Sequence, residues 1–139
     1  MIELLIVITI IGIVMAMALP KMAPLRAGAG VRSAKQVVHA YLATARQAAV
    51  RRGGTAQLVV SGNTVSVTSV VNGVTTQVAA PVNLSEQYGV TVVSDVASIA
   101  YTSRGLARLA GPGKLSFTRD ASKDSVCITI LGMVGKCGL

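Results

Sequence analysis

The spacing of hydrophobic positions changes twice along the chain and divides it into three regions. Residues 4–19 are apolar almost without interruption, whereas apolar residues between Val31 and Arg52 recur at three- and four-residue spacing. From Thr55 onward, apolar and polar residues alternate in short runs. Spacing of three and four is typical of an amphipathic helix, and alternation is typical of strands. The pattern therefore predicts a helical first part followed by a β-rich remainder.

The apolar run Leu4–Leu19 reads LLIVITIIGIVMAMAL. As a helix it would be roughly 24 Å long, slightly short of a hydrocarbon core of about 30 Å, so we expect it to anchor the chain in a membrane with some thinning of the bilayer. A secretory signal peptide is the main alternative, but such peptides carry basic residues ahead of the apolar region. Here the acid Glu3 precedes it, although Ala16 and Ala18 imitate a cleavage site.

A break is expected after the apolar run. Pro20 lacks an N–H and its ring crowds the preceding turn, so it should end or kink the first helix, and Gly12 is a weak point inside that helix. The break extends through Pro24, Gly28 and Gly30. An amphipathic helix is then predicted from Val31 to Arg52, with Gly53 and Gly54 as its stop. Its apolar stripe needs a sheet to cover it.

The β-rich part is predicted to begin with a three-stranded meander. Its strands are Thr55–Ser61, Thr64–Val71 and Val74–Ala80, joined by the turn pairs Gly62-Asn63 and Asn72-Gly73. A loop is expected over Pro81–Gly89, and a polar separator over Arg119–Ser125. Further short strands are predicted at Val90–Val93, Ser98–Thr102 and Lys114–Thr118, followed by a hairpin over Val126–Gly138 that turns near Gly132.

The two cysteines, Cys127 and Cys137, each lie five residues from Gly132. A symmetric hairpin would place them opposite each other at bridging distance, and the spacing matches no metal-binding motif. A disulfide in an extracytoplasmic compartment is the simpler interpretation. Reduced, buried thiols are the alternative.

The charge of the chain is strongly basic, with 13 Lys and Arg against 5 Asp and Glu and a net charge of +8. Such a balance favours polyanions, anionic lipid or acidic partner proteins. In the C-terminal third of the chain, where many of the basic residues lie, the aromatic residues that could stack on bases are limited to Tyr101 and Phe117. Sequence-specific recognition of single-stranded nucleic acid is therefore not expected. The candidate DNA- or anion-binding residues are Arg104, Arg108, Lys114, Arg119, Lys123 and Lys136.

Catalysis finds little support in the sequence. The five acids and the single histidine, His39, offer no paired carboxylates and no triad, and no nucleotide-binding glycine pattern occurs. We therefore predict neither an enzyme nor a cofactor. Asp120 and Asp124 are weak candidates for Ca²⁺, but with Lys123 between them they more often form a solvated loop.

Glu3 is the polar residue that needs an explanation. An ionised carboxylate at the start of an apolar helix is costly unless it is paired or kept near the membrane interface. It could simply lie among lipid headgroups and favour the positive end of the helix dipole. Alternatively, when such helices bundle, it could pair with the N-terminal amine of a neighbouring chain and set their register.

The residues around Glu3 resemble the N-terminal methylation motif of type IV pilins and type II secretion pseudopilins. The matching residues are Met1 to Ile8, Ile10 to Ile13 and Ala18 to Pro20, with the same seventeen positions between Glu3 and Pro20. The family has Leu where this chain has Met1, and a Gly-Phe-Thr stretch before it. We expect a truncated gene model, in which an alternative start codon that normally encodes Leu is taken as the initiator, to account for this difference.

Three short segments are similar to the GspH/FimT group of minor pseudopilins. They are Ala45–Gly53, Tyr101–Gly105 and the closing strand from Cys127 to Ile130. Members of that group include FimT-like minor pilins that bind DNA during natural transformation, which is the alternative function. A solvated basic face that pairs with acidic neighbouring subunits is the simpler interpretation of the C-terminal charges.

The resemblance implies an α+β, pilin-like fold. A long N-terminal helix, hydrophobic in its first half and amphipathic in its second, would pack on an antiparallel β-rich C-terminal domain. Residues 1–30 would form the transmembrane and filament-core segment, and residues 31–139 the extracytoplasmic domain.

The same resemblance implies a structural, minor subunit of a type II secretion pseudopilus or type IV pilus, between which the sequence does not choose. The protein would reside in the bacterial inner membrane and then in a filament in the periplasm or at the cell surface. Its implied partners are membrane lipid, other pilin subunits, a prepilin peptidase and the inner-membrane assembly platform.

Overall fold

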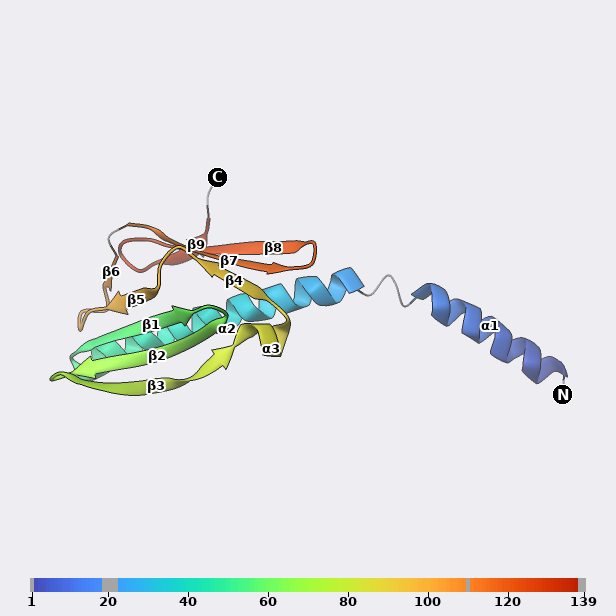
Figure 1. Cartoon of the computed structure of the whole chain (residues 1–139), viewed down its shortest axis with the longest axis horizontal. Coiled ribbons are helices and arrows are strands. Elements are labelled where there is room, and N and C mark those ends of the chain that lie inside the picture. Colours follow the sequence, from blue (N-terminus) through green and yellow to red (C-terminus); the bar gives the residue numbers. More distant parts are fainter. Residues whose placement is uncertain (1, 19–22, 110, 138–139) are drawn as a thin grey trace.

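The structure, a computed structural model, describes residues 2–18, 23–109 and 111–137 (Figure 1). Helices α1 (Ile2–Ala18) and α2 (Ala23–Arg52) come first, and the short helix α3 (Leu84–Tyr88) lies among the strands. The strands are β1 (Thr55–Ser61), β2 (Thr64–Val71), β3 (Val74–Asn83), β4 (Thr91–Ser94), β5 (Ser98–Tyr101), β6 (Ala107–Arg108), β7 (Gly113–Arg119), β8 (Ser122–Ile128) and β9 (Val134–Lys136). Long helices followed by antiparallel sheets confirm the predicted α+β class.

Helix α1 is apolar on every side and exposes its hydrophobic side chains. Among the large side chains of α1 whose exposure the structure describes, Ile11 is the least exposed, at 49%. Gly12 lies inside α1 without interrupting it, whereas Pro20 lies outside the described residues. Nowhere in the described ranges is a helix both long and apolar enough to cross a membrane.

Helix α2 begins at Ala23, so the prediction that it starts at Val31 is wrong. Pro24 is tolerated because the first turn of a helix leaves its N–H groups unbonded. Gly30 lies inside the helix because α3 approaches it closely: a Cβ at this position would lie 2.7 Å from the Tyr88 carbonyl oxygen. Gly30, which looks like a helix breaker in the sequence, is thus a packing requirement. The expected boundary between residues 30 and 31 falls within this helix.

One stripe of α2 fills the space between two sheets. Val31, Ala34, Val38 and Leu42 are at most 3% exposed. The small side chains along this stripe let the helix lie close to the strands, and α2 contacts strands of both sheets. Most of the largest buried side chains come from the sheets, among them Leu58, Ile99, Tyr101, Leu115, Phe117 and Ile128.

The first sheet has the strand order β3-β2-β1-β5-β6 and contains the predicted meander. Its third strand continues through Pro81, which is acceptable because β3 is an edge strand and Pro cannot donate to a ladder. The loop predicted over Pro81–Gly89 is therefore wrong in part: it holds the end of β3 and helix α3, which Asn83 caps by accepting a hydrogen bond from the Ser85 N–H.

The second sheet has the order β4-β7-β8-β9. The polar run Arg119–Ser125 is not a separator, because β7 and β8 form a hairpin with a register that pairs Arg119 with Ser122. Asp120 stands in the turn with a φ of 51°. The sequence of β8 lacks a regular alternation of apolar and polar residues because Asp124 lies on the face toward α2. There it forms an ion pair instead of an apolar contact.

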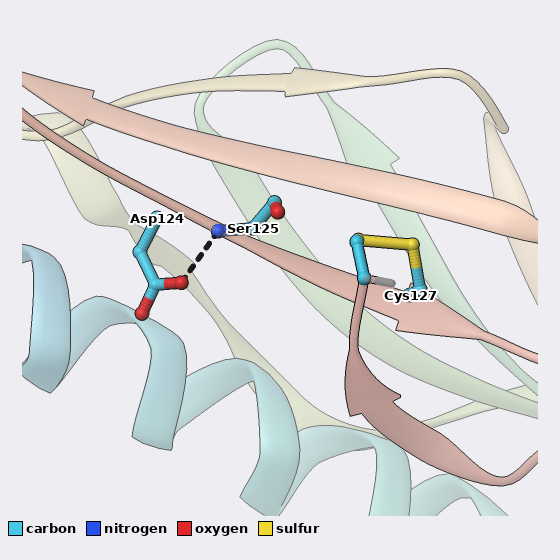
Figure 2. Close-up of a disulfide and its surroundings, with 4 residues drawn as sticks. Asp124, Ser125 and Cys127 are labelled. Atoms are coloured by element: carbon cyan, nitrogen blue, oxygen red, sulfur yellow. Dashed lines mark hydrogen bonds between the residues drawn. A yellow bond between two sulfur atoms is a disulfide. The ribbon is translucent and has the colours of Figure 1, made fainter. Parts of the chain in front are cut away.

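The cysteines are joined, but not by the predicted symmetric hairpin. Cys127 and Cys137 form a disulfide with their Cα atoms 4.9 Å apart. The register of β8 and β9 places Cys127 opposite Gly135 rather than opposite Cys137. The bond is therefore diagonal, on the β8 strand that also carries Asp124 and Ser125 (Figure 2).

Candidate functional site

The predicted basic residues of the C-terminal third do not form a single surface. Arg104 lies in the turn after β5 and Arg108 in β6, both at the edge of the first sheet. Lys114 and Lys123 lie on β7 and β8 of the second sheet, where they are exposed. The side chain of Lys136 is outside what the structure describes.

Arg119 is engaged inside the fold. Its guanidinium donates a hydrogen bond to the Tyr88 carbonyl oxygen at 2.6 Å, and the side chain is half-buried beside Gly30 and Gly89. This contact joins β7 to the end of α3 and to α2. A structural role therefore accounts for Arg119.

The structure instead brings the turn that carries Arg104 against the C-terminal part of α2, with Arg108 on the strand β6 that follows this turn. A Cβ at Gly105 would lie 3.2 Å from Nε of Arg46 and equally close to Val50, so the turn after β5 rests on the helix. Thr102 and Ser103 line one depression together with Gly53 and Gly54. Figure 1 shows β5 and β6 at this end of the domain. We call this surface the basic end and define it as Arg46, Arg51, Arg52, Arg104 and Arg108.

The basic end has little to neutralise it. Arg52 donates a hydrogen bond to the Thr76 hydroxyl, and within the described part of the chain Arg51, Arg104 and Arg108 form no ion pair. The acids lie elsewhere: Glu3 in α1, Glu86 in α3, Asp95 after β4, Asp120 in the β7–β8 turn and Asp124 in β8. Such an unpaired concentration of positive charge favours an anionic ligand.

A separate charged contact joins α2 to β8. Nζ of Lys35 lies 2.9 Å from Oδ2 of Asp124, whose other oxygen accepts a hydrogen bond from the Ser125 N–H at 2.7 Å (Figure 2). Burial, and then the nearby Lys35, lower the pKa of His39 below its usual value, while Asp124 opposes this. Among the described residues no group of three or more His, Cys, Asp or Glu side chains is placed to hold a metal.

The third candidate surface is α1 itself. Glu3 stands in its first turn and is exposed, and the apolar side chains that follow have no cover within the described residues. A helix that is hydrophobic all round is stable only when lipid or other protein surrounds it. Thr9 is not free for a partner, because its hydroxyl donates to the Ile6 carbonyl oxygen of the same helix at 2.8 Å.

Known proteins match this chain in sequence pattern and in fold. The sequence model of the family described as type II transport protein GspH matches residues 34–133. The crystal structure of the type IV minor pilin FimU of Pseudomonas aeruginosa is similar with a TM-score of 0.62 at 14% identity, over 78% of this chain and 88% of that one. The minor pseudopilin EpsH of the Vibrio cholerae type 2 secretion system gives 0.61 at 10% identity, over 77% and 95%. No curated protein sequence matches the chain significantly.

Proposed function

Because this chain belongs to the family of the type II transport protein GspH, we propose that it is a structural, minor subunit of a type IV filament that assembles through α1. It has the fold of minor pilins and pseudopilins. Before assembly the protein is held by lipid in the bacterial inner membrane, with the β-rich domain on the extracytoplasmic side. A prepilin peptidase and the inner-membrane platform act on it there, and the filament lies in the periplasm or at the cell surface.

The observation that carries this proposal is the exposure of α1 together with Glu3. Burying the apolar side chains of α1 against the helices of neighbouring subunits removes them from water at about 25 cal/mol per Å². Inside such a bundle a carboxylate is costly unless it is paired, so Glu3 allows only the axial positions at which a positive group of a neighbour reaches it. Apolar contacts thus supply the free energy of assembly, and Glu3 supplies the register.

Replacing Glu3 tests this division of roles. We expect Glu3→Ala to leave membrane insertion intact, because α1 becomes more apolar, and to stop incorporation into filaments. Fractionated membranes and sheared filaments would be probed for the subunit. Thr9→Ala is the matched control, because the Thr9 hydroxyl bonds within its own helix and its loss should not affect assembly. Normal incorporation of Glu3→Ala would reduce α1 to a plain anchor.

The kind of filament is decided by the phenotype of a deletion strain. A secretion pseudopilus predicts loss of protein export from a strain whose genome encodes the secretion platform. A type IV pilus predicts loss of surface filaments or of transformation. Complementation with the wild-type gene is the control for both.

DNA binding is the second candidate function, and the basic end favours it. Arg51, Arg104 and Arg108 are exposed, come from two distant parts of the chain and lie at one end of the domain without carboxylate partners among the described residues. Phosphate contacts need little beyond such charge, and binding of this kind is independent of sequence and weakens with salt.

A salt-dependent gel shift with the full chain in neutral detergent tests the DNA candidate. Replacing Arg51, Arg104 and Arg108 by Gln should weaken binding and lower the slope of log K against log salt by about 2–3, at about 0.9 per phosphate contact. The matched control removes three charges from other exposed positions: Arg32, Lys114 and Lys123. Equal weakening by both triple variants would show a response to net charge alone and would refute a site at the basic end.

A further inference from the structure

A depression of about 360 Å³ opens between α2 and the loop that joins β8 to β9. Its apolar walls are Leu42 and Ala43 on the helix and Met133 and Val134 on the loop side. Gly132 and the polar side chains of His39, Arg46 and Tyr101 complete the lining. The site therefore combines a short apolar channel with a few hydrogen-bonding groups, as small-ligand pockets do.

The polar groups of this depression lack partners in the fold. Within the described residues no hydrogen bond is made by the side chain of His39, Arg46 or Tyr101. Tyr101 is only 1% exposed as a residue, but its hydroxyl is not among the described side-chain atoms that are fully buried without a partner, so the hydroxyl keeps some contact with solvent. Its remaining route to a hydrogen bond is through the depression that it lines.

The charge state of these groups favours an acceptor that carries negative charge. Burial raises the pKa of Tyr101, although nearby Arg46 opposes this, so the phenol is protonated at neutral pH and can donate. The Arg46 guanidinium is always charged and presents several N–H donors in one plane. A carboxylate pairs with such a guanidinium through two parallel, charge-assisted hydrogen bonds.

The wall opposite the helix is preformed. The N–H of Thr129 donates to the Met133 carbonyl oxygen at 2.9 Å, and the Met133 N–H donates to the Thr129 hydroxyl at 3.1 Å. A Cβ at Gly132 would lie 2.8 Å from the Tyr101 ring, so the loop is seated directly on the floor of the depression. Binding of a ligand would therefore require little further ordering of the loop, which lowers the entropic cost of binding.

We propose that this depression binds a carboxylate carried on a short apolar stem. Arg46 pairs with the carboxylate, Tyr101 donates to it, and the stem lies between the helix and the loop. A free aliphatic acid and the glutamate side chain of a protein partner share this chemistry. Of the residues that line this depression, only Arg46 also belongs to the basic end.

Titration of the full chain in neutral detergent tests the proposal. The reporter is the ¹³C-labelled methyl group of Met133, and the probes are hexanoate and, as its uncharged control, hexanamide. We expect saturable shifts with hexanoate only. Arg46→Gln should weaken binding by about tenfold or more, and Tyr101→Phe by about three- to tenfold, as expected for losing a charged and a neutral partner of a carboxylate.

Arg51→Gln is the matched control, because Arg51 is exposed on the same helix but does not line the depression. Tyr101→Phe should leave stability nearly unchanged, since the hydroxyl has no protein partner. N-acetylglutamate amide and N-acetylglutamine amide form the second pair of probes. Binding of the glutamate compound assigns the site to a protein side chain, and binding of hexanoate alone assigns it to a free acid. Binding of neither acid, or equal binding by Arg46→Gln, would overturn the proposal.

Discussion

Replacing Gly30 by alanine should destabilise the domain even though alanine favours helices. The added Cβ would lie 2.7 Å from the Tyr88 carbonyl oxygen and 2.6 Å from a guanidinium nitrogen of Arg119, which donates to that same oxygen. Overpacking costs about 1–3 kcal/mol and losing a hydrogen bond from a charged donor about 1.5–3 kcal/mol. Higher helix propensity returns about 1 kcal/mol. We therefore expect a net loss of about 1.5–5 kcal/mol from these terms.

Gly28→Ala is the matched control for this substitution. Gly28 lies in the same helix, but the nearest atom that its Cβ would meet is Oγ of Ser122, at an ordinary distance of 3.9 Å. This variant should gain about 0.5–1 kcal/mol. Urea unfolding of the full chain in one neutral detergent, followed by circular dichroism, gives both midpoints. If Gly30→Ala unfolds at the same urea concentration as Gly28→Ala or above it, the close approach of α3 does not constrain α2.

Two further changes can be measured by the same unfolding assay. Replacing both Cys127 and Cys137 by alanine should cost about 2–3 kcal/mol in the chain-entropy model, because the bond closes a short loop with a sequence separation of 10; an unchanged midpoint would contradict this. Burial, and then Lys35, lower the pKa of His39, so the unfolded chain binds more protons and stability should fall as the pH drops below about 6.5. His39→Gln should flatten this dependence, and a variant as pH-sensitive as the wild type would exclude His39 as its source.

The first sheet could be predicted closely because its signals are local. The bounds of β1 and β2 agree with the alternation in Thr55–Ser61 and Thr64–Val71. In the turns between the strands, Gly62, Asn72 and Gly73 have the positive φ that Gly and Asn tolerate. The start of α2 could not be predicted in this way. Gly30 reads as a helix breaker until Tyr88, far along the chain, is known to lie against it.

The candidate sites depend on contacts that no local pattern contains. Arg119 looks like its basic neighbours in the sequence, yet its guanidinium is held by α3. Arg46 looks like an ordinary solvated residue of the polar face of a helix, yet the turn that carries Arg104 lies against it at Gly105. The distribution of charge along the sequence therefore predicts Arg104 and Arg108 of the basic end, but not the arginines that α2 contributes to it.

Successive turns of α2 contact different parts of the domain. The positions of the residues that make these contacts are therefore coupled through the geometry of the helix. Gly30 lets α3 pack close to the helix, Lys35 forms an ion pair with Asp124 of β8, and Arg46 lies against the turn after β5. Each residue of an α-helix is rotated by about 100° from the previous one. A single insertion in α2 would therefore turn every later residue away from its partner at once. The length of α2 between Gly30 and Arg46 is thus as much a determinant of the basic end and the depression as the arginines themselves.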